Sequence, residues 1–538
     1  MKMKRQKAMT ISVIVTLLYG AITYYLTYPA LNITNWGFWF YIIGIVLVFS
    51  ILHTILITPT AIEGLFTRKS IKSFKAYKLL LLVPIIFLGI IVINFFMAPF
   101  FNAEAYYKRI KVDTGVFEEE IKEVDFNKLP LLDRDSTLKI GDRTMGQMSE
   151  LVSQFDVSDQ YTQINYNDEI IRVTPLEYSG LIKWFTNRKN GIKAYITVNS
   201  TTGAADLIKM DKGMKYAPSA YFNENLYRKI QMSYPTKNIG SINFEIDNDG
   251  NPYWIASVEK YVGVGLRRDV VGVIILDPIT GDSKYYPVDK VPSWVDHVYD
   301  ADLVLEQVSD WGRYKNGFWN SIISQKEVVD TTTGYNYLAQ DDDIYLYTGI
   351  TSVISDESNI GFILTNMRTK ETKFYGVAGA EEYSAMDSAK GQVQQMNYTS
   401  TFPLLINLNN KPTYLVSLKD NAGLVKMYAF VDVVDYQKVV VTDSTKGIEK
   451  AAEAYLNETL DEEDSKGNLE KEITIHSIGT AIIDGNTYYY FLDENDQKYR
   501  VSIKIDKKQL PFLTNGEKIK IKYAKENEVI DITDIEWN

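Results

Sequence analysis

The sequence contains no cysteine and only three histidines among its 538 residues. The absence of cysteine excludes a disulfide framework, a thiol nucleophile and a cysteine-based metal site. His297 and His476 are the two histidines of the C-terminal region, and two dispersed histidines cannot build a histidine-rich zinc site. The G-x-S-x-G, H-E-x-x-H and P-loop motifs are also missing from the sequence. We therefore predict no catalytic residue, no metal ligand and no cofactor.

Long apolar runs are confined to the first hundred residues. They cover residues 8–28, 36–57 and 79–98, and none of them contains Asp, Glu, Lys or Arg. Each run has about 20 residues, which is enough for a helix to cross a hydrocarbon core of ~30 Å. Asn94, Pro84 and His53 are their notable polar or helix-breaking residues. The pattern predicts three transmembrane helices that contact the lipid bilayer through residues 8–98.

Positive charge around these runs indicates their orientation, because cytoplasmic loops gather Lys and Arg. The turn at residues 29–35 has no Lys or Arg, whereas basic residues precede the first run and separate the second from the third. The N-terminus is therefore predicted to be cytoplasmic and the large C-terminal region extracytoplasmic. A cleaved signal peptide is the alternative for residues 1–28, although no A-x-A-like site follows it. The basic residues inside are Lys2, Lys4, Arg5, Lys7, Arg68, Lys69, Lys72, Lys75 and Lys78, against Lys108, Arg109 and Lys111 outside.

The region after the apolar runs is strongly acidic. Residues 1–110 hold 11 basic and 2 acidic side chains, which leaves 46 basic and 66 acidic residues and a net charge of about −20 for the remainder. Nucleic acid is bound mainly by neutralising its phosphates. We therefore expect no nucleic-acid partner.

Paired hairpin patterns recur along this region. Alternating apolar residues flank Gly, Asp, Asn and Pro clusters, which is the hairpin signature. The pairs lie at residues 242–260 with 270–288, 335–351 with 361–377, 402–419 with 424–441 and, more loosely, 164–178 with 191–210. Segments with helical patterns stand between them, at residues 145–155, 217–232, 294–324, 378–396 and 446–456. The unit is thus predicted to be a helix followed by a four-stranded antiparallel meander.

The repeat resembles a known family of exported modules. The turn Asp277-Pro278-Ile279-Thr280-Gly281 has the D-P-x-T-G pattern, between the third and fourth strands of its unit. In plan and turn the unit resembles the PepSY domain and the wider cystatin-like layout, which implies modules that bind or restrain partners, often peptidases. The whole chain is also similar to three-span envelope proteins of Gram-positive bacteria, a resemblance that implies no activity.

The C-terminal segment has a different pattern. Five strands are predicted at residues 473–483, 487–492, 498–505, 518–523 and 529–536, and their order resembles an OB-fold barrel. Tyr488 and Tyr490 are candidates for partner binding, although alternate tyrosines of a barrel strand also simply lie inside and outside. The fold class is therefore membrane-anchored α+β. Its expected parts are three transmembrane helices (1–100), a juxtamembrane linker (101–143), four α+β modules (144–212, 213–290, 291–378 and 379–443), a helical linker (444–467) and an OB-like β-barrel (468–538).

Three short motifs that suggest chemistry have structural interpretations. The triplet Asp113-Thr114-Gly115 copies an aspartic-protease motif, but no second copy is present, so a juxtamembrane turn is expected. The S-x-x-K pattern at Ser136 has no S-x-N or K-T-G partner. Asp247 opens a sequence similar to a calcium loop, but Val258 stands where the bidentate acid would be needed. A hairpin turn explains the Asp247 segment.

Residues 292–319 are the strongest candidate for a partner-binding surface, because tryptophans among charged residues are typical interface anchors. The alternative is that these tryptophans pack against their own sheets. The candidates are Trp294, Asp296, His297, Trp311 and Trp319.

Taken together, these patterns predict a noncatalytic, membrane-anchored binding or scaffold protein of the cell envelope, with other envelope or membrane proteins as partners. Two alternatives are open. One is an envelope hydrolase whose two carboxylates, with raised pKa values, come together only in the fold. The other is an accessory subunit of a membrane transport complex, in which small residues such as Gly20 and Gly44 would contact partner helices.

Overall fold

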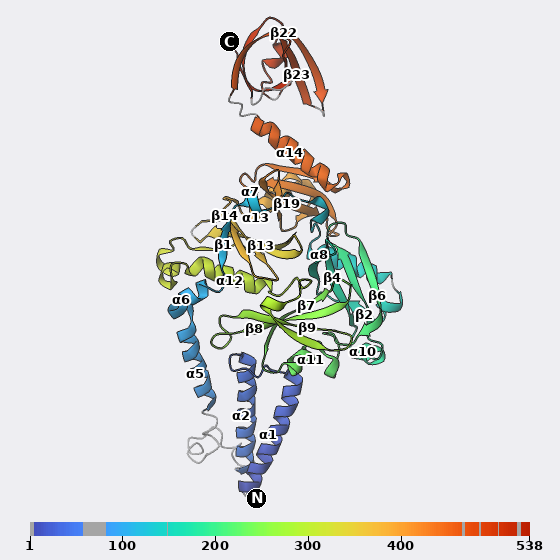
Figure 1. Ribbon diagram of the computed structural model, residues 1–538, viewed down its shortest axis with the longest axis vertical. Coiled ribbons are helices and arrows are strands. Elements are labelled where there is room, and N and C mark those ends of the chain that lie inside the picture. Colours follow the sequence, from blue (N-terminus) through green and yellow to red (C-terminus); the bar gives the residue numbers. More distant parts are fainter. Residues whose placement is uncertain are drawn as a thin grey trace. The chain divides into compact units, whose positions relative to one another are not determined.

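The computed structural model describes residues 5–57, 82–147, 149–353, 355–464, 469–483, 486–503, 505–523 and 529–537. The chain forms two compact units. The first comprises residues 1–426 and 431–436, and the second comprises residues 427–430 and 437–538. Figure 1 labels the helices and strands of both units.

Helices α1 (Arg5–Thr27) and α2 (Trp36–Ile57) are long and apolar enough to cross a membrane. They pack side by side (Figure 1), and α1 buries every fourth residue from Ala8 to Gly20. The Tyr41 hydroxyl on α2 donates a hydrogen bond to the Gly20 carbonyl at 3.0 Å. A Cβ atom added to Gly44 would lie 3.4 Å from the Tyr19 hydroxyl of α1. The small residues of these two helices therefore serve packing within the chain.

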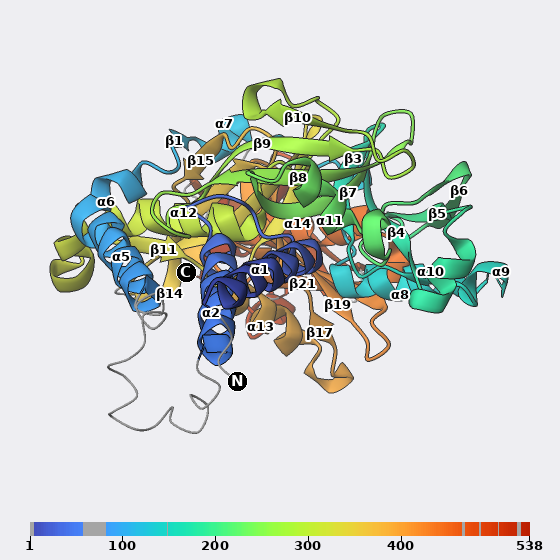
Figure 2. The ribbon, with the colours of Figure 1, turned by 90° about the horizontal axis from the view of Figure 1, so that it is seen from below.

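The third predicted span is bent. Helix α5 (Leu82–Met97) is followed after Ala98 by α6 (Pro99–Tyr107), and the two axes differ by 54°. Pro99 has no backbone N–H to continue the α5 hydrogen-bond ladder, so α6 starts in a new direction. The pair forms a third span only if both helices are counted together. Figure 2 shows α5 to one side of the α1–α2 pair. The basic residues Lys2, Lys4, Arg68, Lys69, Lys72, Lys75 and Lys78 lie outside the described residues.

The first sheet has the order β2-β4-β5-β6, with β3 also paired to β4. Helix α8 (Arg134–Gly146) packs against it and is followed by α9 (Ser149–Val152). We expected a helix at residues 145–155; α8 begins eleven residues earlier because the Asp133 side chain accepts the Ser136 N–H at 3.0 Å and caps it. The strands are β2 (Phe155–Val157), β3 (Thr162–Tyr166), β4 (Glu169–Tyr178), β5 (Ile192–Asn199) and β6 (Ala205–Met214), and α10 (Leu181–Asn187) follows β4.

The second sheet is a four-stranded antiparallel meander of order β10-β9-β8-β7. Its two faces belong to different cores. On β8, Trp254 packs into the core shared with the first sheet, whereas Ile255 packs into the core shared with α12 (Ala301–Tyr314) and the third sheet. Burial on both faces explains the continuous apolar run of β9. The elements are η3 (Phe222–Glu224), α11 (Leu226–Ser233), β7 (Asn238–Ile246), β8 (Pro252–Lys260), β9 (Asp269–Leu276), β10 (Ser283–Pro287) and η4 (Val288–Lys290).

The first, third and fourth sheets have more than the four strands predicted. In the third, β1 (Val112–Gly115) from the juxtamembrane linker pairs in parallel with β15 (Thr372–Tyr375). That sheet has seven strands and the fourth has five, of order β17-β19-β20-β21 with β18 on β19, among the described residues. The other elements are α7 (Phe117–Glu120), η2 (Phe126–Lys128), η5 (Asn320–Ser324), β11 (Val329–Thr331), β12 (Asn336–Gln340), β13 (Asp343–Ser352), β14 (Ser355–Asn366), β16 (Gly379–Ala380), α13 (Glu382–Gln392), η6 (Gln394–Met396), β17 (Thr399–Ser400), β18 (Leu404–Leu408), β19 (Lys411–Lys419), β20 (Val425–Asp432) and β21 (Val439–Asp443).

The C-terminal strands close into a five-stranded barrel of order β22-β23-β24-β26-β25, which confirms a barrel at this end of the chain. Phe491, Tyr499 and Ile521 lie in its core. Its elements are β22 (Leu469–Ile483), β23 (Asn486–Asp493), β24 (Lys498–Ser502), η8 (Leu510–Phe512), β25 (Lys518–Tyr523) and β26 (Val529–Trp537), and η7 (Ser444–Lys446) and α14 (Ile448–Asp464) precede them.

Candidate functional site

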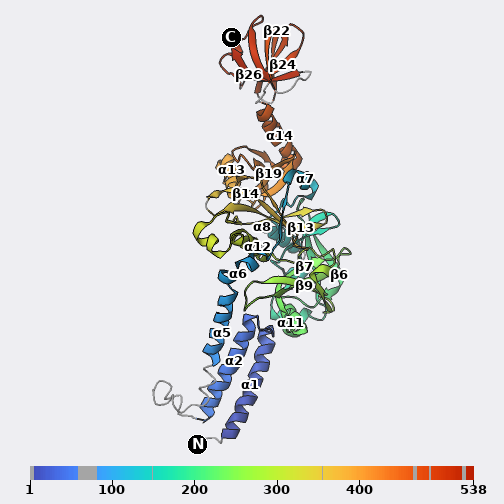
Figure 3. The ribbon, with the colours of Figure 1, turned by 60° about the vertical axis from the view of Figure 1, so that its left-hand side comes forward.

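The β-sheet region is attached directly to the end of α1 and to the loop that joins α1 to α2. The loop between α1 and α2 bonds to the segment before β7: the Leu31 N–H donates to the Pro235 carbonyl at 2.7 Å. The Gly265 N–H donates to the Thr34 carbonyl at 2.9 Å, so the β8–β9 loop is also attached. On α11, Arg228 Nε donates to the Tyr25 carbonyl at 2.9 Å, where Figure 3 shows α11 beside the end of α1. We call these contacts of residues 25–35 the membrane seat.

Two of the predicted tryptophans pack against their own sheets. Trp294 is half-buried, and its ring centroid lies 5.1 Å from that of Tyr253 on β8. Trp311 on α12 packs into the core shared by the second and third sheets, 6.2 Å from the ring of Phe374. Trp294 and Trp311 therefore pack against neighbouring sheets, as the alternative to a partner-binding surface predicts.

Trp319 is placed differently, with 59 % of its surface exposed. Its ring lies 5.4 Å from that of Phe100 on α6, and Phe100 lies 5.4 Å from Phe318. Because Phe100 directly follows the bend of the third predicted span, these rings form an aromatic cluster next to the membrane helices. Exposed aromatic rings at such a position are typical of the membrane–water interface.

Asp296 and His297 are buried and bind groups of the chain itself. The two carboxylate oxygens of Glu245 on β7 accept the backbone N–H groups of Asp296 at 2.9 Å and of His297 at 3.1 Å. The Asp296 carboxylate in turn accepts the N–H of Asn165 at 2.8 Å, and His297 Nε2–H donates to the Gln163 carbonyl at 2.7 Å. These bonds join the loop after the second sheet to β3 of the first sheet.

Burial shifts the pKa values of all three groups. Burial raises the pKa of Glu245 to about 7, and it raises the pKa of Asp296 well above its usual range, helped by the charge of Glu245. Burial lowers the pKa of His297 to about 4, so that imidazole is neutral at physiological pH. The two carboxylates hold loop backbone, and neither lines any of the four clefts described for the structure.

Tyr488 and Tyr490 lie on β23 of the barrel, on the same face because side chains alternate along a strand. Tyr489 between them packs against the barrel core. The guanidinium of Arg500 on β24 lies 5.4 Å from the ring of Tyr488. Tyr488 and Tyr490 are therefore on the outer face, with a neighbouring cation.

The three chemical motifs have structural roles. Asp113 lies on β1 in a sheet, where a turn was expected. Ser136 Oγ donates to the Gly423 carbonyl at 3.1 Å. Asp247 Oδ1 accepts the N–H groups of Asp249 and Asn251 at 3.0 and 2.8 Å, which closes the hairpin turn. In the part of the chain that the structure describes, no group of three or more His, Asp or Glu side chains could hold a metal ion.

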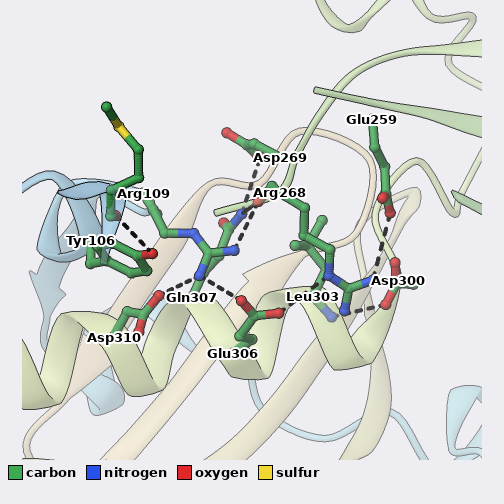
Figure 4. A network of polar contacts seen from close by, with 11 residues as sticks. Tyr106, Arg109, Glu259, Arg268, Asp269, Asp300, Leu303, Glu306, Gln307 and Asp310 are labelled. Atoms are coloured by element: carbon green, nitrogen blue, oxygen red, sulfur yellow. Dashed lines mark hydrogen bonds and ion pairs between the residues drawn. The ribbon is translucent and has the colours of Figure 1, made fainter. Parts of the chain in front are cut away.

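Sequence patterns gave no signal for a buried ion network that follows α6 (Figure 4). Arg109, whose side chain is 3 % exposed, contacts the carboxylates of Glu306 and Asp310 on α12, the former at 2.8 Å. Its Nη2 donates to the Arg268 carbonyl at 2.8 Å. Burial raises the pKa of Asp310 to about 6, against the lowering effect of the Arg109 charge. This network attaches the segment after the third predicted span to α12 and β9.

The largest of the four clefts described for the structure lies among three sheets and the juxtamembrane linker, and we call it the linker cleft. It has a volume of about 680 Å³. The linker runs along β18, where the Val124 N–H donates to the Asn407 carbonyl at 2.9 Å. Five carboxylates and two lysines line the cleft, and each lysine pairs with one of the carboxylates: Lys122 with Asp341, and Lys128 with Asp168 at 3.3 Å. The other three carboxylates are Glu123, Asp125 and Asp342.

Comparisons with known proteins give no family for this arrangement. No protein-family model matches the chain, and no curated protein is significantly similar to it.

Proposed function

We propose that the chain is a noncatalytic, membrane-anchored binding or scaffold protein of the cell envelope that engages protein partners with its extracytoplasmic region. The membrane seat supports this role, because it holds the ectodomain against the two membrane helices without a flexible stalk among the described residues. An ectodomain fixed in this way presents its clefts at a defined height and orientation above the bilayer.

The observation that carries the proposal is the linker cleft. Its carboxylates outnumber its lysines by five to two, in a region whose net charge is about −20. Charge complementarity favours a partner segment rich in Lys or Arg, and it raises the rate of encounter with such a partner. Asp342 and Asp125 are exposed in the cleft, and they are the carboxylates best placed to contact the Lys- or Arg-rich segment of the partner.

Finer features of the fold belong to the same proposal. The second sheet, with its β9–β10 turn at Asp277, is the segment that supports a PepSY-like or cystatin-like module. The strand order of the barrel supports an OB-like adaptor, and the bent pair α5–α6 supports a third span. We also propose that the N-terminus is cytoplasmic and that the large region after the spans is extracytoplasmic.

The two alternatives gain no support from the geometry. The hydrolase alternative calls for two carboxylates with raised pKa values in a cleft, whereas Glu245 and Asp296, whose pKa values are raised, are buried and accept backbone N–H groups. An accessory transport subunit would need small-residue faces for partner helices, whereas Gly20 and Gly44 lie between α1 and α2.

A crosslinked pull-down from the native membrane, read by mass spectrometry, tests the proposal. We expect one stoichiometric envelope or membrane protein, and we expect Asp125→Asn combined with Asp342→Asn to reduce its recovery. Asp282→Asn with Asp289→Asn removes the same charge outside the cleft and serves as the matched control. Recovery of the chain alone, or equal recovery with both double variants, would contradict the role assigned to the linker cleft.

A further inference from the structure

A second cleft, of about 460 Å³, lies among residues of all four sheets and the start of α8. About half of its lining residues are aromatic or apolar, and these include Tyr335, Tyr337 and Phe402. A cleft of this size with converging polar groups is within the range of small-molecule sites. We call it the Arg172 cleft, after the cation that lines it.

Arg172 on β4 is 8 % exposed and has no carboxylate within ion-pair distance among the described residues. Its Nε and Nη2 atoms donate to Gln163 Oε1 at 3.2 and 3.0 Å, and Nη1 reaches Thr137 Oγ1 at 3.4 Å. Among the described residues Arg109 is also deeply buried, and it has two carboxylate partners. A buried cation is costly unless it is paired. Arg172 therefore has no carboxylate counterion, whereas Arg109 has two.

The nearby carboxylate of Asp133 is already engaged. It pairs with Lys419, and it accepts the Ser136 N–H at 3.0 Å. Burial lowers the pKa of Arg172 to about 10, so the guanidinium is still charged at neutral pH. Arg134 and Asp159 also line the cleft, so that, with Lys419 paired to Asp133, three cationic side chains are present against two carboxylates.

One further donor in the same cleft has no partner. The Nε2 group of Gln163, a residue that is 4 % exposed, is buried without a hydrogen bond. The Gln163 amide is oriented by its oxygen, which accepts from Arg172. The Tyr161 hydroxyl also has no partner, but it packs against Gly141 of α8. A cation and an unmatched N–H donor are complementary to an anion with acceptor oxygens.

We propose that the Arg172 cleft binds a small organic carboxylate with an aromatic or apolar body. The carboxylate accepts from Arg172 and Gln163, and the body of the ligand packs against Tyr335, Tyr337 and Phe402. The apolar walls favour such a ligand over inorganic phosphate or sulfate, which have no apolar surface to bury. This site is independent of the protein partner proposed for the linker cleft.

Calorimetric titration of the full-length protein in detergent tests the site with four probes: 3-phenylpropionate, the neutral 3-phenylpropanol, acetate and inorganic phosphate. We expect 3-phenylpropionate to bind in the millimolar range or tighter. We expect the alcohol and acetate to bind about tenfold more weakly or not at all, since the alcohol lacks the carboxylate and acetate lacks the aromatic body. No saturable binding of 3-phenylpropionate, equal binding of the alcohol, or binding of phosphate alone would overturn the proposal.

The variant Gln163→Glu gives a second test, which adds a stability readout to the binding of the probe. It places a carboxylate where the Gln163 amide already contacts Arg172, so it supplies the missing counterion from within the chain. We expect a higher melting temperature and loss of 3-phenylpropionate binding. Arg188→Gln, which removes an arginine stacked on Trp184, is the control and should bind as the parent does. An unchanged or lower melting temperature with parental binding of the probe would overturn the proposal.

Discussion

The side chain of Asn94 and the backbone of Val264 make two reciprocal hydrogen bonds. The Val264 N–H donates to Asn94 Oδ1 at 2.8 Å, and Asn94 Nδ2 donates to the Val264 carbonyl at 3.0 Å. Asn94 lies near the end of α5, and Val264 lies in the loop between β8 and β9. Asn94 is a polar residue in the otherwise apolar helix α5, and its side chain binds the backbone of the β8–β9 loop.

Asn94→Ala removes both of these bonds at once. We expect it to destabilise the protein by about 1–3 kcal/mol, because the polar backbone groups of Val264 are left without partners. Thermal unfolding of the purified full-length protein in detergent measures the change. Ile93→Ala is the control, since Ile93 is 50 % exposed and should shift the melting temperature little. Equal shifts for the two variants would contradict the role given to Asn94.

Arg109→Met breaks the buried ion network after α6. We expect a loss of about 3–5 kcal/mol, because Asp310 and Glu306 lose the cation that they share. The loss should shrink at acidic pH, since a protonated Asp310 needs no counterion and its pKa is already about 6. Denaturant unfolding at several pH values checks both statements.

The control for this variant is Lys111→Met, two residues along the chain. Lys111 pairs with Asp113, but its side chain is 84 % exposed, so the pair contributes little to stability. A similar loss of unfolding free energy for Lys111→Met, or no loss for Arg109→Met, would show that the Arg109 network does not stabilise the fold.

Glu245 makes the stability of the ectodomain depend on pH. Its pKa rises from an ordinary value of 4.5 to about 7 in the folded chain. Between these values the folded chain keeps a proton that the unfolded chain has lost, so stability falls as the pH rises. The contribution is complete below pH 4.5 and is lost as the pH rises through 7. A single group of this kind changes the unfolding free energy by at most about 1.4 kcal/mol per pH unit.

Glu245→Gln should flatten that pH dependence, because it also removes the charge that raises the pKa of Asp296. The measurement is the denaturant midpoint at a series of pH values between 4.5 and 8. Glu371→Gln removes an exposed carboxylate and should keep the parental slope. Parallel curves for the parent chain and Glu245→Gln would show that Glu245 does not titrate in this range.

The elements that sequence patterns predicted well are those with a strong local signal. The apolar run at residues 36–57 coincides with α2, and the alternating segment at residues 518–523 coincides with β25. In both, the hydrophobic period of one element is enough to set its type and bounds. The continuous apolar residues of β9 are also a local signal, because they fit a strand that is buried on both faces, as β9 is.

Long-range pairings had no such signal. The partner of β1 is β15, far along the chain, and nothing local to Asp113 indicates a sheet rather than a turn. The same holds for Arg109, which meets Glu306 and Asp310 only in the fold. Among the predicted site residues, Trp294 and Trp311 are half-buried and pack against Tyr253 and Phe374 of neighbouring strands, contacts that composition alone does not predict.

Every role proposed for the ectodomain depends on its being outside the membrane, and the lack of native cysteine makes this directly measurable. Single cysteines are introduced by Ser153→Cys, at an exposed ectodomain position, and by Lys7→Cys, at the exposed start of α1. Intact cells are then treated with a membrane-impermeant maleimide. We predict that Ser153→Cys is labelled in intact cells and that Lys7→Cys is labelled only after permeabilisation. Labelling of Lys7→Cys in intact cells, with Ser153→Cys protected, would contradict this prediction.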